Sequence, residues 1–150
     1  MSRIEWTVAI KRPVNEVFEL VANPENTPKW ASGSAGSKKI TEGPIRAGTK
    51  FRSVAKGLGR RMEAETEMTV YEPNRTFVST IRSGPVPAEI RYTFDKGEDG
   101  TILRVTMDWK PGGFFGGFFK LAQPLLDAMA RRRFQRDLDH LRDMMERQAV

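Results

Sequence analysis

Residues 4–30 read IEWTVAIKRPVNEVFELVANPENTPKW, and this stretch decides the class of fold. Apolar and polar side chains alternate from Ile4 to Ile10, the period-two pattern of a half-buried strand. Pro13 follows where its fixed φ suits a helix start. Asn23-Pro24 stops that helix and can cap a second short one, which ends near Trp30. Helical spacing is shown by these residues: Val14, Val17, Phe18, Val21 and Ala22.

The next part of the chain, from Ser37 to Trp109, contains only strand and turn patterns. The clearest strand is 61–71, where an apolar row from Met62 to Val70 alternates with Arg and Glu. With the first strand this makes about seven, and their short turns require antiparallel neighbours. The other strands are expected at 38–41, 49–55, 76–82, 88–95 and 101–109.

The last part of the chain changes to helical spacing after Pro111. A curved sheet with one inner face needs a cover, and this helix is the only element long enough to provide it. The fold class is therefore α+β: a seven-stranded antiparallel sheet curved around a long C-terminal helix, with two short helices after the first strand, in one domain over residues 1–150. The helical pattern rests on Leu121, Leu125, Ala128, Met129, Leu138, Leu141 and Met145.

Composition narrows the possible functions. The chain has 150 residues and no cysteine, so disulfide and thiolate chemistry are excluded. The net charge of +6 is dispersed, and the Arg131–Arg133 run is followed by acidic residues on the same segment, which is typical of a solvated helix face and not of a nucleic-acid site. The first 25 residues lack the apolar core of a signal peptide, and no apolar run approaches a membrane span, so we expect a cytoplasmic protein.

The whole chain resembles the polyketide cyclase/dehydrase-like branch of the SRPBCC (START-like, helix-grip) superfamily. The resemblance implies a deep, largely apolar pocket between the sheet and the C-terminal helix, and it supplies no catalytic residue. Family members include lipid carriers, hormone-binding proteins and aromatase/cyclases. The matching segments are the opening from Ile4 to Trp30, GPIRAGTKFR at 43–52, YEPNRTF at 71–77, the Ser83-Gly84-Pro85 turn, Asp99-Gly100-Thr101 and the closing LDHLRDMME.

A pocket of this kind should be lined by inward-facing apolar side chains. Methionine fills irregular space, so a lining rich in Met and aromatic residues can adapt to varied ligands. A dry, empty void of about 300 Å³ would destabilise the fold by about 7 kcal/mol, so the pocket must be partly polar, occupied or smaller. The expected lining is Trp30, Phe51, Thr66, Met68, Phe77, Ile81, Tyr92, Met107, Trp109, Leu125 and Met129. The same side chains also suit a plain hydrophobic core.

The stretch GGFFGGFF at 112–119 lies between the last strand and the long helix. Its glycines allow a hinge, and four phenylalanines (Phe114, Phe115, Phe118 and Phe119) can close over an apolar opening. We interpret them as a pocket gate. The alternative is that Phe118 joins the buried stripe of the helix while Phe114 and Phe115 pack beneath a loop.

Catalytic residues are not identified by the sequence. His140 is the only histidine and is expected on the surface of the long helix, and a His/Cys metal site is ruled out by count. The polar candidates for proton transfer are Arg82, Arg104, Asp108 and Tyr92, and strand alternation turns Arg104 and Asp108 toward solvent. No cofactor is implied.

Three classes of function follow. The first is binding of a small hydrophobic molecule, a lipid or an aromatic, polyketide-like compound, by a monomer or homodimer. The alternative is a polyketide cyclase/dehydrase-type enzyme that uses the same pocket, which would require a buried carboxylate–Arg or Tyr–Asp pair. The third, contact of the basic helix with a membrane or an acidic partner, is the least favoured.

Overall fold

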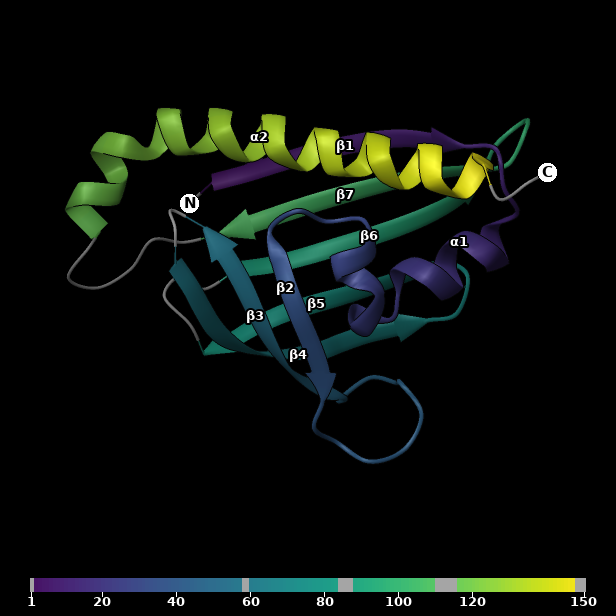
Figure 1. Cartoon of the computed structure of the whole chain (residues 1–150), viewed down its shortest axis with the longest axis horizontal. Coiled ribbons are helices and arrows are strands. Elements are labelled where there is room, and N and C mark those ends of the chain that lie inside the picture. The colour runs from purple at the N-terminus through teal and green to yellow at the C-terminus, as the bar shows by residue number, and fades with distance from the viewer. Residues whose placement is uncertain (1, 58–59, 84–87, 110–115, 148–150) are drawn as a thin grey trace.

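The computed structural model describes residues 2–57, 60–83, 88–109 and 116–147, and these form one curved sheet with three helical segments (Figure 1). The elements in chain order are β1 (Ser2–Ile10), α1 (Val14–Val21), η1 (Pro24–Lys29, a 3-10 helix), β2 (Ser34–Lys39), β3 (Lys50–Gly57), β4 (Arg60–Glu72), β5 (Thr76–Ser83), β6 (Ala88–Lys96), β7 (Thr101–Trp109) and α2 (Gly116–Arg147).

The first three elements follow the sequence pattern. In β1 the apolar row from Ile4 to Ile10 is buried, while Glu5 and Thr7 are exposed. Pro13 stands immediately before α1, which buries Val17, Phe18 and Val21 against the sheet. The side chain of Asn23 accepts a hydrogen bond from the backbone N–H of Glu25 at 3.1 Å and so caps η1.

The seven strands form a single sheet in the order β1-β7-β6-β5-β4-β3-β2, and every neighbouring pair is antiparallel. The register shifts between Glu65 and Thr66 and between Met68 and Val70, where β4 bends. Bending of this kind lets β2 and β3 cross in front of β5 and β6 in Figure 1. The inner face of the sheet therefore has two walls that oppose each other.

Strand β2 differs from the expectation. It spans Ser34–Lys39, not 38–41, and pairs with β3 from Ser34 onward. The segment is rich in Gly and Ser, which have low strand propensity, so its pairing comes from the neighbouring strand and not from its own composition.

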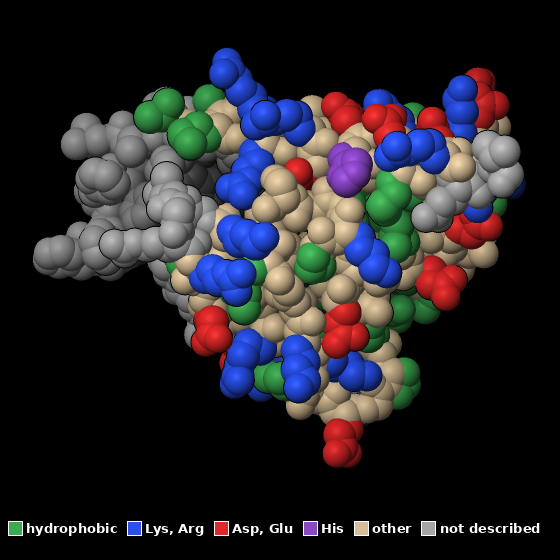
Figure 2. Space-filling view, in the orientation of Figure 1, with side chains coloured by type: hydrophobic (Ala, Val, Ile, Leu, Met, Phe, Trp, Pro, Cys, Tyr) green, Lys and Arg blue, Asp and Glu red, His purple; other side chains and the backbone are tan. Residues whose placement is uncertain are grey.

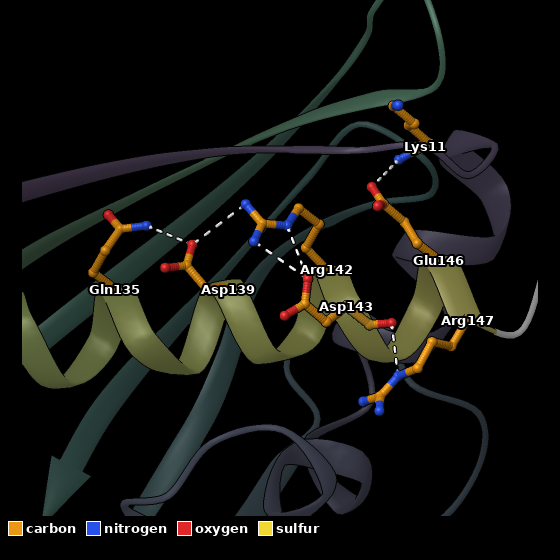
Figure 3. Close-up of polar contacts among 7 residues, drawn as sticks. All are labelled: Lys11, Gln135, Asp139, Arg142, Asp143, Glu146 and Arg147. Atoms are coloured by element: carbon orange, nitrogen blue, oxygen red, sulfur yellow. Dashed lines mark hydrogen bonds and ion pairs between the residues drawn. The ribbon is translucent and has the colours of Figure 1, made fainter.

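Helix α2 packs along β1 at one edge of the sheet (Figure 1). Leu138, Leu141 and Met145 are buried there, and the Trp6 indole N–H donates to the backbone oxygen of Arg131 at 3.1 Å. Near the C-terminal end, Glu146 accepts a hydrogen bond from the backbone N–H of Lys11 at 3.0 Å (Figure 3). These contacts fix the C-terminal half of the helix over the inner face of β1.

No helix among the described residues combines the length and hydropathy needed to cross a membrane.

Candidate functional site

A cavity of about 200 Å³ lies on the inner face of the sheet, between η1–β2 on one side and β5–β6 on the other. The sequence predicted a pocket between the sheet and the C-terminal helix. The described lining includes no side chain of α2, and the side chains of α2 at 116–124, 126, 127 and 130 lie outside the described residues. The described lining consists of Val21, Pro24, Thr27, Gly33, Ser34, Ser37, Ser53, Val54, Ala55, Ala64, Thr66, Phe77, Ser79, Ile81, Ile90 and Tyr92.

The lining combines apolar surface with hydroxyl groups. Phe77 and Tyr92 are cross-strand partners whose rings stack at a centroid distance of 4.3 Å and an interplanar angle of 13°. The hydroxyls of Ser37 and Ser53 lie 2.9 Å apart on β2 and β3 and hydrogen-bond each other. Thr27, Ser34, Thr66 and Ser79 contribute further hydroxyls, and no described lining residue is charged.

Tyr92 is the most deeply placed polar group of the site. Its side chain is 8% exposed, and none of the described residues forms a hydrogen bond with its hydroxyl. Burial raises the pKa of the Tyr92 phenol well above its ordinary value, because the anion would lose its hydration. The group is therefore a neutral hydrogen-bond donor throughout the physiological pH range.

Arg133 connects α2 to the rim of the cavity. Its guanidinium donates to the Ser32 hydroxyl at 3.3 Å and to the backbone oxygen of Lys56 at 3.2 Å. It also lies against Gly33, where an added Cβ would be 3.5 Å from the guanidinium carbon. Gly33 lines the cavity, so Arg133 ties the helix to the wall formed by β2 and β3.

Four of the expected lining residues face the cavity: Thr66, Phe77, Ile81 and Tyr92. Three others (Trp30, Phe51 and Met68) are buried in the hydrophobic core beside it, and Met107 is partly buried against that core. The backbone of Trp109 ends β7, and its side chain lies outside the described residues.

Leu125 and Met129 lie on the surface of α2, where they are 65% and 52% exposed. The angular position of these residues around the helix axis explains their exposure. Met129 precedes the buried Leu138 by about two and a half helical turns, so the two side chains point to opposite sides of the helix. The described apolar side chains of α2 thus form two stripes, not the single stripe that the sequence predicted.

None of the four phenylalanines predicted to form the pocket gate has a described side chain. Phe114 and Phe115 lie outside the described residues, and Phe118 and Phe119 belong to the beginning of α2, where only the backbone is described. Gly116 and Gly117, expected as hinge residues, are part of that helix.

The polar residues considered for catalysis are directed away from the cavity, except Tyr92. Arg82 pairs with Glu67 at 3.3 Å, and Asp108 pairs with Arg3 at 2.7 Å. Arg104 and His140 are exposed. Each of these groups has an ordinary surface environment, so the cavity has a single strongly buried titratable side chain among its described lining residues.

The serines of the lining were not among the residues predicted from the sequence. Two of them carried a readable signal: Ser53 lies two residues from the inward Phe51, and Ser79 lies two residues from the inward Phe77, so each shares a strand face with its neighbour. Ser34 and Ser37 carried no such signal, because β2 has no apolar row to show which side faces inward.

A second, wider groove of about 680 Å³ lies between β1 and α2. Its described lining is mainly charged, with Glu5, Arg131, Arg132 and Arg136 around the edge of Trp6. Figure 2 shows Lys and Arg side chains spread over the visible face with Asp and Glu among them. An open groove with charged walls does not exclude water, and the smaller cavity is therefore the better candidate for binding an apolar molecule.

A curved seven-stranded antiparallel sheet, two short helices after the first strand and a long C-terminal helix define the START-like, helix-grip class of protein. Within that class the chain belongs to the polyketide cyclase / dehydrase and lipid transport family, whose model matches residues 1–146.

Solved structures of similar fold agree with this assignment. The aromatase/cyclase Zhui from Streptomyces sp. R1128 has a TM-score of 0.82 at 17% identity, over 99% of this chain and 96% of that one. A START superfamily protein from Mycobacterium smegmatis has a TM-score of 0.78 at 17% identity, over 97% of each chain. A protein from Thermus thermophilus has a TM-score of 0.81 at 16% identity, over 99% of this chain and 100% of that one. At these identities the likeness establishes the fold. No curated protein matches the chain.

Proposed function

We propose that this protein binds a small, largely apolar molecule in the cavity between η1–β2 and β5–β6. The main support is the cavity itself, about 200 Å³ with the Phe77–Tyr92 stack in its wall. A dry, empty cavity of that size would destabilise the fold by about 5 kcal/mol at about 24 cal/mol per Å³. Total stabilities are about 5–15 kcal/mol, so such a cavity must hold water on its hydroxyl groups or a ligand on its apolar wall, and both suit a binding site.

Shape alone would bind such a molecule weakly. Burial of about 200 Å² of apolar ligand surface contributes about 5 kcal/mol at about 25 cal/mol per Å², and association costs at least about 4 kcal/mol. Useful affinity therefore requires hydrogen bonds to the polar lining.

A cyclase or dehydrase activity is the second candidate, because the family description includes both activities. Proton transfer in such a reaction needs an acid and a base in contact with the substrate. The described lining contains one buried phenol, Tyr92, and neither a carboxylate nor a guanidinium. This composition favours binding over turnover.

Native mass spectrometry of the protein purified from its own host tests the proposal. We expect a retained molecule that is released on denaturation and whose mass is unchanged by incubation with the protein. Release of nothing, from several preparations, would contradict binding. A product lighter than the retained molecule by one water would favour the dehydrase.

A further inference from the structure

We propose that the ligand of this cavity is uncharged and carries a hydrogen-bond-accepting oxygen that the Tyr92 hydroxyl binds. This inference rests on the proposed function, since it specifies the chemistry of the molecule bound there. It distinguishes ketones, ethers and alcohols on a compact ring system from carboxylates such as fatty acids, from amines and from pure hydrocarbons.

The absence of charge in the described lining argues for a neutral ligand. Its side chains are aliphatic, aromatic or hydroxyl-bearing, and the charged residues of β4 and β5, such as Glu67 and Arg82, pair with each other outside the cavity. A carboxylate or ammonium moved into this site would lose its hydration without gaining an opposite charge. Such a group would bind much more weakly than a neutral one of the same shape.

The Tyr92 phenol argues for an accepting oxygen. A buried hydroxyl normally has a partner, because a donor without one destabilises its state by about 1–3 kcal/mol. Tyr92 is nine-tenths buried and lines the cavity, and its hydroxyl forms no hydrogen bond with another described residue. Unlike Arg12 Nε, Glu16 Oε2 and Trp30 Nε1, the Tyr92 oxygen is not one of the fully enclosed atoms of the described residues that lack a hydrogen bond, so a ligand in the cavity can reach it. Its ring is held by the stack on Phe77, so the hydroxyl has a fixed position from which to donate.

The Ser37–Ser53 pair gives the cavity a second polar point on its other wall. One hydroxyl of the pair donates to the other at 2.9 Å, which leaves one hydroxyl hydrogen and several lone pairs free. This pair lies on β2 and β3, whereas Tyr92 lies on β6, beyond β4 and β5 in the sheet. A ligand with oxygens at two ends would be fixed in one orientation between these points.

Five probes on one ring system test the proposal: indane, 1-indanone, 1-indanol, indane-1-carboxylate and 1-aminoindane. Each is titrated into the protein by calorimetry and by amide chemical shifts. We expect 1-indanone and 1-indanol to bind about three- to ten-fold more tightly than indane, as one net hydrogen bond predicts. The two charged probes should bind at least about ten-fold more weakly than indane. Shifts should centre on Ser53, Ser79 and Tyr92.

Tyr92→Phe separates a hydrogen bond from general packing, because it keeps the ring and removes the hydroxyl. It should bring the affinity for 1-indanone to within about two-fold of that for indane and leave indane unchanged. The matched control is Tyr71→Phe, since Tyr71 packs on Phe18 and does not line the cavity.

The outcomes separate the two proposals. Equal binding of indane and 1-indanone, tightest binding of the carboxylate or amine, or full affinity for 1-indanone in Tyr92→Phe would overturn the inference about the ligand and leave the binding function standing. If none of the five probes binds, the proposed function itself fails.

Discussion

Replacement of Ala64 by Leu distinguishes a hollow site from a packed one. Ala64 lies on β4, and its side chain lines the cavity. The change adds three carbon atoms, which at about 0.8 kcal/mol each contribute about 2.4 kcal/mol on burial. The loss of side-chain conformational entropy on ordering the leucine opposes this by about 0.5–1 kcal/mol. We therefore expect the free energy of unfolding to rise by about 1–2 kcal/mol.

The assay is urea denaturation, with the slope of the transition checked so that a change in midpoint reports stability. Ala9→Leu is the matched control, because Ala9 is an exposed residue on the outward face of β1 and leaves the cavity unchanged. It should change stability by less than about 0.5 kcal/mol. Ala64→Leu should also weaken 1-indanone binding by more than ten-fold, while Ala9→Leu binds normally.

The sign of the change in unfolding free energy distinguishes an empty cavity from a packed interior. In a well-packed interior, three extra carbons force neighbouring side chains apart and destabilise the fold by about 1–3 kcal/mol. Destabilisation by Ala64→Leu, with normal binding of the probe, would therefore refute the assignment of this space as a binding cavity.

Three further predictions follow from other parts of the structure. Gly100→Ala should lower stability by at least about 2 kcal/mol, because the added Cβ would lie 2.3 Å from the backbone oxygen of Ile10. Gly43→Ala, with a φ of +94° and no atom within 4 Å of the new Cβ, should lower stability by only about 1 kcal/mol. Equal losses of stability for the two variants in urea denaturation would contradict the close contact between Gly100 and Ile10. Burial raises the pKa of Tyr92, so the folded protein keeps a proton that the unfolded chain begins to lose near pH 10. The contribution of the neutral Tyr92 phenol to the free energy of unfolding is complete below about pH 10 and falls as the pH rises further. Tyr92→Phe should therefore lose less stability than the wild type between about pH 9 and pH 11. Parallel pH profiles of the two proteins would contradict the burial of the phenol. Arg133→Ala should change stability by less than about 1 kcal/mol, because the side chain is exposed. It should nevertheless speed exchange of 1-indanone in NMR line shapes, whereas Arg132→Ala should not, and equal exchange rates would remove Arg133 from the rim.

The sequence predicted the fold well where one face of an element is strongly apolar. From Ile4 to Ile10 every second residue is buried, and in β6 Tyr92 and Phe94 are buried two residues apart, so the register of these strands follows from burial. Strand β2 is the exception among the strands. Its Gly and Ser residues neither alternate nor favour a strand, so its start at Ser34 depends on pairing with β3.

The site was only partly predictable for the same reason. Large inward residues such as Phe77 and Tyr92 are recognisable, but the hollow exists where side chains are small, and small residues give no periodic signal. The space next to Ser37, Ser53 and Ala64 is visible only once β2 and β3 fold over β5 and β6. The exposure of Met129, in contrast, follows from counting helical turns to Leu138 and was available from the sequence.

The position of a heavy-atom probe tests the central claim most directly. Crystals soaked with 5-bromo-1-indanone should show anomalous density for bromine inside the cavity, with the ketone oxygen within hydrogen-bonding distance of the Tyr92 hydroxyl. Bromine in the groove between β1 and α2, or an unchanged cavity at saturating probe, would contradict the claim that this cavity is where the protein binds its ligand.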